Sequence, residues 1–168
     1  KILFTLYIVL MLMPFQVTML SSYLVLDRLH MLDTQGAVIL PAIFSTFPVF
    51  LIYRGFRGVH PGLLEAGRMD GAGELRLFVM IGLPLGSSGI LSAFVLGFLE
   101  YWNMIEQPLT FLKNKALWPL SLYLPEIGLN QAGFAFAASV VTLIPALFIF
   151  LLGQDYLEQG IAMSGLKE

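Results

Sequence analysis

Side chains able to do acid–base, nucleophilic or metal chemistry are few and scattered along the 168 residues. The chain has no cysteine, and its two histidines, His30 and His60, lie at loop positions where a solvated or interfacial imidazole is the simplest interpretation. Zinc sites and nucleophile–base sites need such residues grouped together. The apolar stretches contain no aspartate pair, no His-Glu-x-x-His motif and no Ser/His group. We therefore predict no catalytic site, metal site or cofactor.

The most informative polar segment reads His60-Pro61-Gly62-Leu63-Leu64-Glu65-Ala66-Gly67-Arg68-Met69-Asp70-Gly71-Ala72. Proline suits the first turn of a helix, where its missing N–H costs nothing. Glu65 falls near the positive end of such a helix, and Gly71 accepts the left-handed conformation that ends many helices. The pattern predicts a short amphipathic helix from Pro61 to Asp70-Gly71. A plain connector would show the same pattern, so local physics alone does not assign it a function.

The elements that must position this segment are apolar. Hydrophobic residues make up 58% of the chain and charged residues 12%, against about a quarter charged in soluble domains. Four stretches, 2–25, 36–53, 77–99 and 132–152, have no Asp, Glu, Lys or Arg in their interiors. Lengths of roughly 20 residues suit helices that cross a hydrocarbon layer. We predict an all-α, polytopic membrane protein with four transmembrane helices in contact with lipid.

Two features of these stretches affect helix geometry. Prolines within or beside them each remove one helical hydrogen bond, at Pro14, Pro41, Pro48, Pro84 and Pro145. Small residues recur over 82–97 and 133–139, which permits close helix packing. Membrane helices commonly carry both features, so neither identifies a transport pathway.

The distribution of charge predicts the orientation. With a net charge of -2 and no basic block, the chain offers no surface for nucleic acid. Four crossings place both ends on one side, which then holds Lys1, Arg54, Arg57, Arg68, Arg76 and Lys167, while the other side holds Arg28, Lys113 and Lys115. Because cytoplasmic loops carry the excess of Lys and Arg, the loop 54–76 and the C-terminus are predicted to be cytoplasmic.

The loop resembles a known signature. Glu65-Ala66-Gly67, three residues, Gly71, nine residues, Ile81, one residue and Leu83-Pro84 have the spacing of the E-A-A-x3-G-x9-I-x-L-P pattern of ABC importer permeases. The departure is Gly67 where the family usually has alanine, and because glycine costs about 1 kcal/mol in a helix interior we expect a looser helix. Trp102-Asn103 and the tail from Gln154 through Gly160 to Lys167 resemble the carbohydrate-uptake group of that family.

The resemblance implies a multi-pass inner-membrane permease of the maltose type, with ATP hydrolysed by a separate subunit. It implies that Glu65, Ala66, Gly67, Asp70, Gly71 and Ala72 contact a cytoplasmic ATPase subunit, that a second permease subunit completes the pathway, and that an external solute-binding protein delivers a carbohydrate. Family members typically have six spans, so we expect residues 1–168 to be the C-terminal part of such a transmembrane domain, with two spans before Lys1.

Substrate contacts are predicted at Glu100, Trp102 and Asn103, because an aromatic face beside carboxylate and amide groups suits a hydroxylated ring. Anchoring at the headgroup level explains the same residues, together with Tyr101, Trp118 and Tyr123.

Two other classes of protein remain open from the residues. A secondary transporter usually keeps ionisable residues inside its spans, and the four interiors have none, which argues against proton coupling more than against sodium coupling. A non-transporting membrane scaffold is opposed only by the signature loop.

Overall fold

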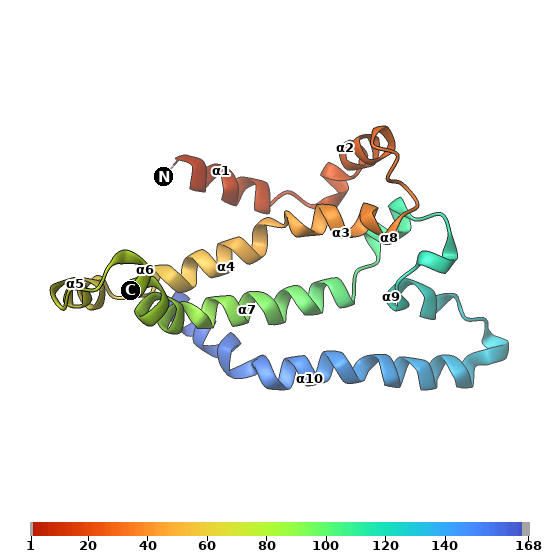
Figure 1. The fold of residues 1–168 in the computed structure, drawn as a ribbon. Coiled ribbons are helices and arrows are strands. Elements are labelled where there is room, and N and C mark those ends of the chain that lie inside the picture. The colour runs from red at the N-terminus through yellow and green to blue at the C-terminus, as the bar shows by residue number, and fades with distance from the viewer. Residues whose placement is uncertain (1, 166–168) are drawn as a thin grey trace. The chain divides into compact units, whose positions relative to one another are not determined.

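The computed structural model describes residues 2–165, and these contain helices but no strand (Figure 1). The predicted all-α fold is confirmed. Lys1 and Lys167, which entered the charge comparison, lie outside the described residues. The α-helices are α1 (Ile2–Met11), α2 (Phe15–Arg28), α3 (Gln35–Ile43), α4 (Thr46–Arg57), α5 (Pro61–Met69), α6 (Glu74–Leu77), α7 (Leu83–Trp102), α8 (Glu106–Phe111), α9 (Leu120–Tyr123) and α10 (Ala132–Gly165). A π-helical turn, Phe78–Gly82, joins α6 to α7, and 3₁₀ turns occupy Lys115–Leu117, Leu124–Glu126 and Leu129–Gln131.

Three helical stretches are long and apolar enough to cross a membrane: Gln35–Arg57, Glu74–Trp102 and Ala132–Leu157. They contain the predicted spans 36–53, 77–99 and 132–152, each extended by a few residues. The first predicted span, 2–25, is instead a pair of helices, α1 and α2, bent by 96°. By length and composition, the described residues therefore hold three candidate spans, or four if the bent pair crosses as one.

The bend in the first stretch has a local cause at Pro14. Proline has no N–H to continue the ladder of α1, and its backbone is extended, with φ -69° and ψ 151°. The last turn of α1 closes just before it, through a bond from the Met13 N–H to the Leu10 carbonyl at 3.2 Å. A new helix then begins at Phe15. The sequence places a proline here, but it does not predict a turn of this size.

The chain divides into two compact units, and the boundaries between them fall within α4, α7 and α10. The first unit contains residues up to Thr46 together with Phe98–Phe148. Its core consists of Leu26, Ala37 and Phe111, and the Phe15 ring lies edge-on to Phe111 at 5.9 Å. Helix α8 thereby packs on both α2 and α3.

Hydrogen bonds also join two connecting segments of the first unit. Asp33, whose φ is 58°, donates its N–H to the Phe111 carbonyl at 2.9 Å. Its carboxylate Oδ1 accepts the N–H groups of Lys113 and Asn114 at 2.9 and 2.7 Å. The loop before α3 and the chain after α8 consequently lie at the same end of this unit.

The second unit contains Phe47–Gly97 and residues from Ile149 on. Here α4 and α7 cross with backbone against backbone, because a Cβ at Gly55 would lie 2.7 Å from the Gly89 Cα. Next to Gly55, the ring of Phe56 stacks on the ring of Phe78 at 5.8 Å. The crossing holds α4 beside α7. Helix α4 precedes the loop that contains α5, and α7 follows that loop.

The C-terminal part of α10 packs on α7 in the same unit. A Cβ on Gly153 would overlap the side chain of Val95, and the Ser92 hydroxyl donates to the Tyr156 carbonyl at 2.9 Å. The predicted use of small residues on 82–97 is therefore realised on two faces of α7. Gly55 and Gly153, which complete these contacts, were not predicted because their partners are distant in sequence.

Candidate functional site

The predicted short helix exists as α5, and both of its ends are capped. It begins at Pro61, and the His60 Nδ1 atom accepts the N–H of Gly62 at 3.1 Å. It ends at Met69, where Gly71 has φ +79° and the Ala72 N–H donates to the Gly67 carbonyl at 3.0 Å. A second bond joins the Gly71 N–H to the Arg68 carbonyl at 3.0 Å, which completes a Schellman motif. The helix is thus a defined element and not a loose connector.

Gly67 is the contact point between α5 and the following span. A Cβ at this position would lie 2.5 Å from Leu77 Cδ2 and 3.0 Å from Ile81 Cδ1. Leu77 is only 2% exposed, so it has little room to move. The expected loosening of the helix by glycine is offset, because the absence of a methyl group lets α5 pack closely on these two side chains.

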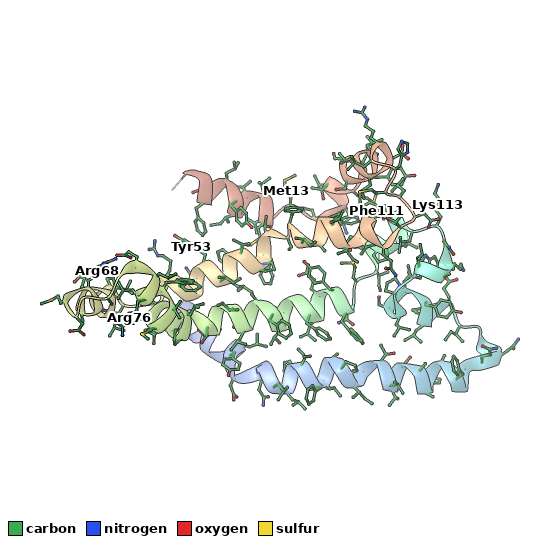
Figure 2. The ribbon with its side chains drawn as sticks, in the orientation of Figure 1. Met13, Tyr53, Arg68, Arg76, Phe111 and Lys113 are labelled. Carbon is green, nitrogen blue, oxygen red and sulfur yellow. The ribbon has the colours of Figure 1, made fainter. Side chains whose placement is uncertain are left out.

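A bidentate ion pair lies beside this contact, at the left of Figure 2 where Arg68 is labelled. Arg68 Nε donates to Glu74 Oε1 at 2.9 Å, and Nη2 donates to Oε2 at 3.3 Å. Both side chains are more than half exposed. The hydrogen bond to Glu74 raises the pKa of Arg68 above its ordinary value. The pair bridges the Schellman turn and connects the end of α5 to the start of α6.

Apart from the contact at Gly67, much of the surface of α5 is exposed. The exposed residues include Glu65, Ala66 and Asp70, three of those predicted to contact a partner. Met69 is 89% exposed and Leu63 is 48% exposed, so large apolar side chains lie among the carboxylates. Exposed methionine is adaptable and common at binding surfaces. We call this set, Leu63, Glu65, Ala66, Met69 and Asp70, the α5 face.

The six predicted coupling residues therefore divide into two groups. Glu65, Ala66 and Asp70 lie on the α5 face. Gly67 packs inward, while Gly71 and Ala72 form the turn that ends the helix.

Glu100, Trp102 and Asn103 lie in the first unit, at and just after the end of α7. Trp102 stacks on Phe98 at 5.2 Å and donates its indole N–H to the Thr142 carbonyl at 3.2 Å. The Asn103 amide donates to the Leu99 carbonyl at 2.8 Å. Glu100 is exposed and has no hydrogen bond or ion pair among the described residues. Only Glu100 retains all of its hydrogen-bonding capacity for a ligand, and the substrate role of the three residues stays a prediction.

The neighbouring aromatic residues also donate hydrogen bonds to backbone carbonyls. Tyr101 donates its hydroxyl to Ala42 at 2.9 Å, and Trp118 donates its indole N–H to Leu112 at 3.2 Å. The Lys115 ammonium lies 4.9 Å from the centre of the Trp118 ring. Polar tips of aromatic side chains usually find such partners when half-buried. These contacts give Tyr101 and Trp118 a structural role.

Sequence reasoning missed three residues that contact or cap α5. His60 was interpreted as a solvated loop residue, and because histidine is not one of the usual N-cap residues, no local signal pointed to its bond with the Gly62 N–H. Glu74 follows Arg68 by six residues, a spacing that no single helix brings together, so only the turn at Gly71 makes this pair possible. Leu77 was interpreted only as the start of a span.

The described residues hold no group of three or more His, Asp or Glu side chains placed to bind a metal ion. The fold and site so far define a polytopic α-helical membrane protein that displays one capped helix on a polar loop between two spans.

The chain belongs to the family described as the binding-protein-dependent transport system inner membrane component, which matches residues 1–163. This family consists of transport components and not of enzymes. Membership favours a component of a binding-protein-dependent transport system. It argues against the secondary transporter and the scaffold, which the residues alone left open.

Several relatives resemble the chain over nearly its full extent. The arabinooligosaccharides transport system permease protein AraQ of Bacillus subtilis is 32% identical over 171 residues, covering 99% of this chain and 60% of that protein. The protein of the same name from Halalkalibacterium halodurans is 30% identical, covering 98% and 60%. The sn-glycerol-3-phosphate transport system permease protein UgpE of Yersinia enterocolitica is 30% identical, covering 92% and 57%. The chain thus spans about three fifths of the length of these relatives.

Proposed function

We propose that the chain is part of the permease subunit of an ATP-driven importer, and that the α5 face docks on a cytoplasmic ATPase subunit. The observation that carries this proposal is that different residues of α5 serve different purposes. Its inner side and both ends are used in intramolecular contacts, through Gly67, His60 and Gly71. The side chains of the α5 face make no hydrogen bond or ion pair with other described residues, and they combine two carboxylates with an exposed methionine.

The state of the helix before binding favours docking. A helix that is already capped loses little conformational freedom when a partner binds, so more of the contact free energy appears as affinity. An exposed apolar side chain among charged groups is also a common arrangement for an anchor residue that enters a pocket. Met69 is such an anchor, with Glu65 and Asp70 supplying charge around it.

Orientation follows from the same assignment. An ATPase that uses cellular ATP requires the loop of α5 to be cytoplasmic, which agrees with four arginines between Arg54 and Arg76. Two spans separate the loop of α5 from the end of α10, so both lie on the cytoplasmic side.

The substrate that we propose is a carbohydrate or another small polyhydroxylated solute, delivered by an external solute-binding protein. The names of the relatives above, for arabinooligosaccharides and for sn-glycerol-3-phosphate, share that chemistry. Exposed Glu100, with Trp102 and Asn103 nearby, supplies groups suited to hydroxyls. A second permease subunit would complete the pathway, and the span Ala132–Leu157, whose most apolar 18-residue window has no buried residue, has surface available for it and for lipid.

The docking proposal is tested by co-purification. The full-length protein is expressed with its second permease and ATPase subunits and extracted in mild detergent, and the ATPase retained on the tagged permease is quantified. We expect Glu65→Ala and Met69→Asp to reduce retention, and Asp27→Ala, which removes an exposed carboxylate from α2, to leave it unchanged. Equal retention in all variants, with normal membrane insertion, would contradict docking through the α5 face.

A further inference from the structure

We propose, resting on the coupling function above, that Arg68 and Glu74 are positioning residues. Together with the Gly67 contact they fix α5 to the span that follows it, so that movement of α5 is transmitted to α6 and α7. The inference comes from two contacts made by successive residues of the last turn of α5.

The two contacts restrain different movements of the helix. The Gly67 contact with Leu77 and Ile81 sets how close α5 lies to the following span. By itself it would allow α5 to roll about its own axis on those side chains. Arg68 projects about 100° further around the helix, since there are ~3.6 residues per turn, and its two bonds to Glu74 oppose that rotation. Two parallel bonds also fix the orientation of both planar groups.

The contacts act on a particular part of the span. Leu77 is the last residue of α6, and Ile81 lies in the π-helical turn Phe78–Gly82. In that turn the Leu83 N–H donates to the Phe78 carbonyl, five residues back, and Pro84 supplies no N–H at all. Because π turns and prolines are where helices bend, a push from α5 reaches the span at its most easily bent segment.

The ion pair is suited to orientation more than to stability. Both side chains lie in water, where an isolated pair adds little to the free energy of folding. Loss of the pair should therefore leave the protein folded and inserted. It should instead let α5 rotate about its own axis when the ATPase subunit moves it. ATP hydrolysis then continues, but less of it produces transport.

The test measures transport per ATP hydrolysed, in proteoliposomes containing the full-length protein, its second permease, the ATPase subunits and the binding protein with a labelled arabinooligosaccharide. We expect Arg68→Glu and Glu74→Arg each to lower this ratio roughly fivefold, at the lower end of common coupling effects. The double variant Arg68→Glu/Glu74→Arg, which restores opposite charges, should recover most of it. The matched control is Lys115→Glu, which breaks the exposed Lys115–Glu126 pair of the first unit and should leave the ratio unchanged.

A second measurement does not depend on transport. Residues 1–168 contain no cysteine, so a nitroxide can be placed at Met69→Cys once any cysteine elsewhere in the full-length protein is replaced. We expect the Arg68→Glu and Glu74→Arg variants to increase the mobility of the label and the double variant to reverse the increase.

The outcomes separate the two proposals. If the unaltered complex retains its ATPase but the single charge reversals match it in both ratio and label mobility, the positioning role is wrong and docking survives. A double variant no better than either single variant would also overturn the positioning role. If the unaltered permease retains no ATPase, docking itself fails.

Discussion

Gly67 and Gly71 lie four residues apart in one loop, but each is required for a different reason. At Gly71 no atom would touch an added Cβ within 4 Å, and the constraint is the backbone, with φ +79°. At Gly67 the backbone is ordinary helix, and the constraint is the space taken by Leu77 and Ile81. Substitutions at the two positions should therefore fail in different ways.

The loss of stability on replacing Gly71 should follow the free-energy cost of holding each new residue in the left-handed conformation. Gly71→Asn should be tolerated, Gly71→Ala should destabilise the turn by about 1 kcal/mol, and Gly71→Val should destabilise it more, because β-branched residues fit that region worst. Hydrogen exchange of the peptide covering 61–77 checks the order, since the Ala72 N–H reports the Schellman bond.

The control for this series is Gly73→Ser. Gly73 has φ -71° and also has open space around it, and serine there supplies a cap to α6. Exchange should stay the same or slow. Equal acceleration by Asn, Ala and Val at position 71 would mean that the cost of the left-handed conformation does not limit this site.

At the scale of the element, the crossing of α4 and α7 depends on a missing side chain in each helix. A Cβ at Gly55 would meet the Gly89 Cα and N at 2.7 and 2.9 Å, and these are backbone atoms that cannot rotate away. A substitution here must separate the helices. The crossing thus sets the spacing of the two spans that hold the loop of α5.

Gly55→Ala should accordingly destabilise the protein by about 1–3 kcal/mol, the usual cost of overpacking. The control is Gly133→Ala at the start of α10, where no atom lies within 4 Å and alanine favours the helix. Thermal unfolding in detergent should show a lower midpoint for Gly55→Ala and an unchanged or higher one for Gly133→Ala. A similar midpoint for both variants would show that the α4–α7 crossing is wider than described.

These elements also show which features a sequence reveals. Pro61 and Gly71 act on their own backbone, so the limits of α5 were predictable, as were the apolar spans. Contacts such as Gly55 with Gly89, or Arg68 with Glu74, depend on how separate segments come together, and no local pattern encodes them. Pro14 is intermediate, because proline predicts a break in the helix but leaves the 96° bend to the packing of α2 on α8.

At the scale of the whole molecule, the number of spans between two segments determines which side of the membrane each occupies. One span, Glu74–Trp102, separates the loop of α5 from the segment after α7, so the two lie on opposite sides. One span, Gln35–Arg57, likewise separates the loop before α3 from the loop of α5. The loop before α3 should thus share a side with the segment after α8, and the bonds from Lys113 and Asn114 to Asp33 agree.

Single cysteines at three exposed positions test this arrangement together with its direction. We expect Leu29→Cys and Lys113→Cys to react with a membrane-impermeant maleimide in intact cells, and Met69→Cys to react only in inverted membrane vesicles. The result does not depend on whether α1 and α2 cross as one span, because every segment compared follows the bend. Labelling of Met69→Cys from outside would reverse the orientation and remove the α5 face from any cytoplasmic ATPase. Labelling of Leu29→Cys with Met69→Cys would instead show that Gln35–Arg57 does not cross the membrane.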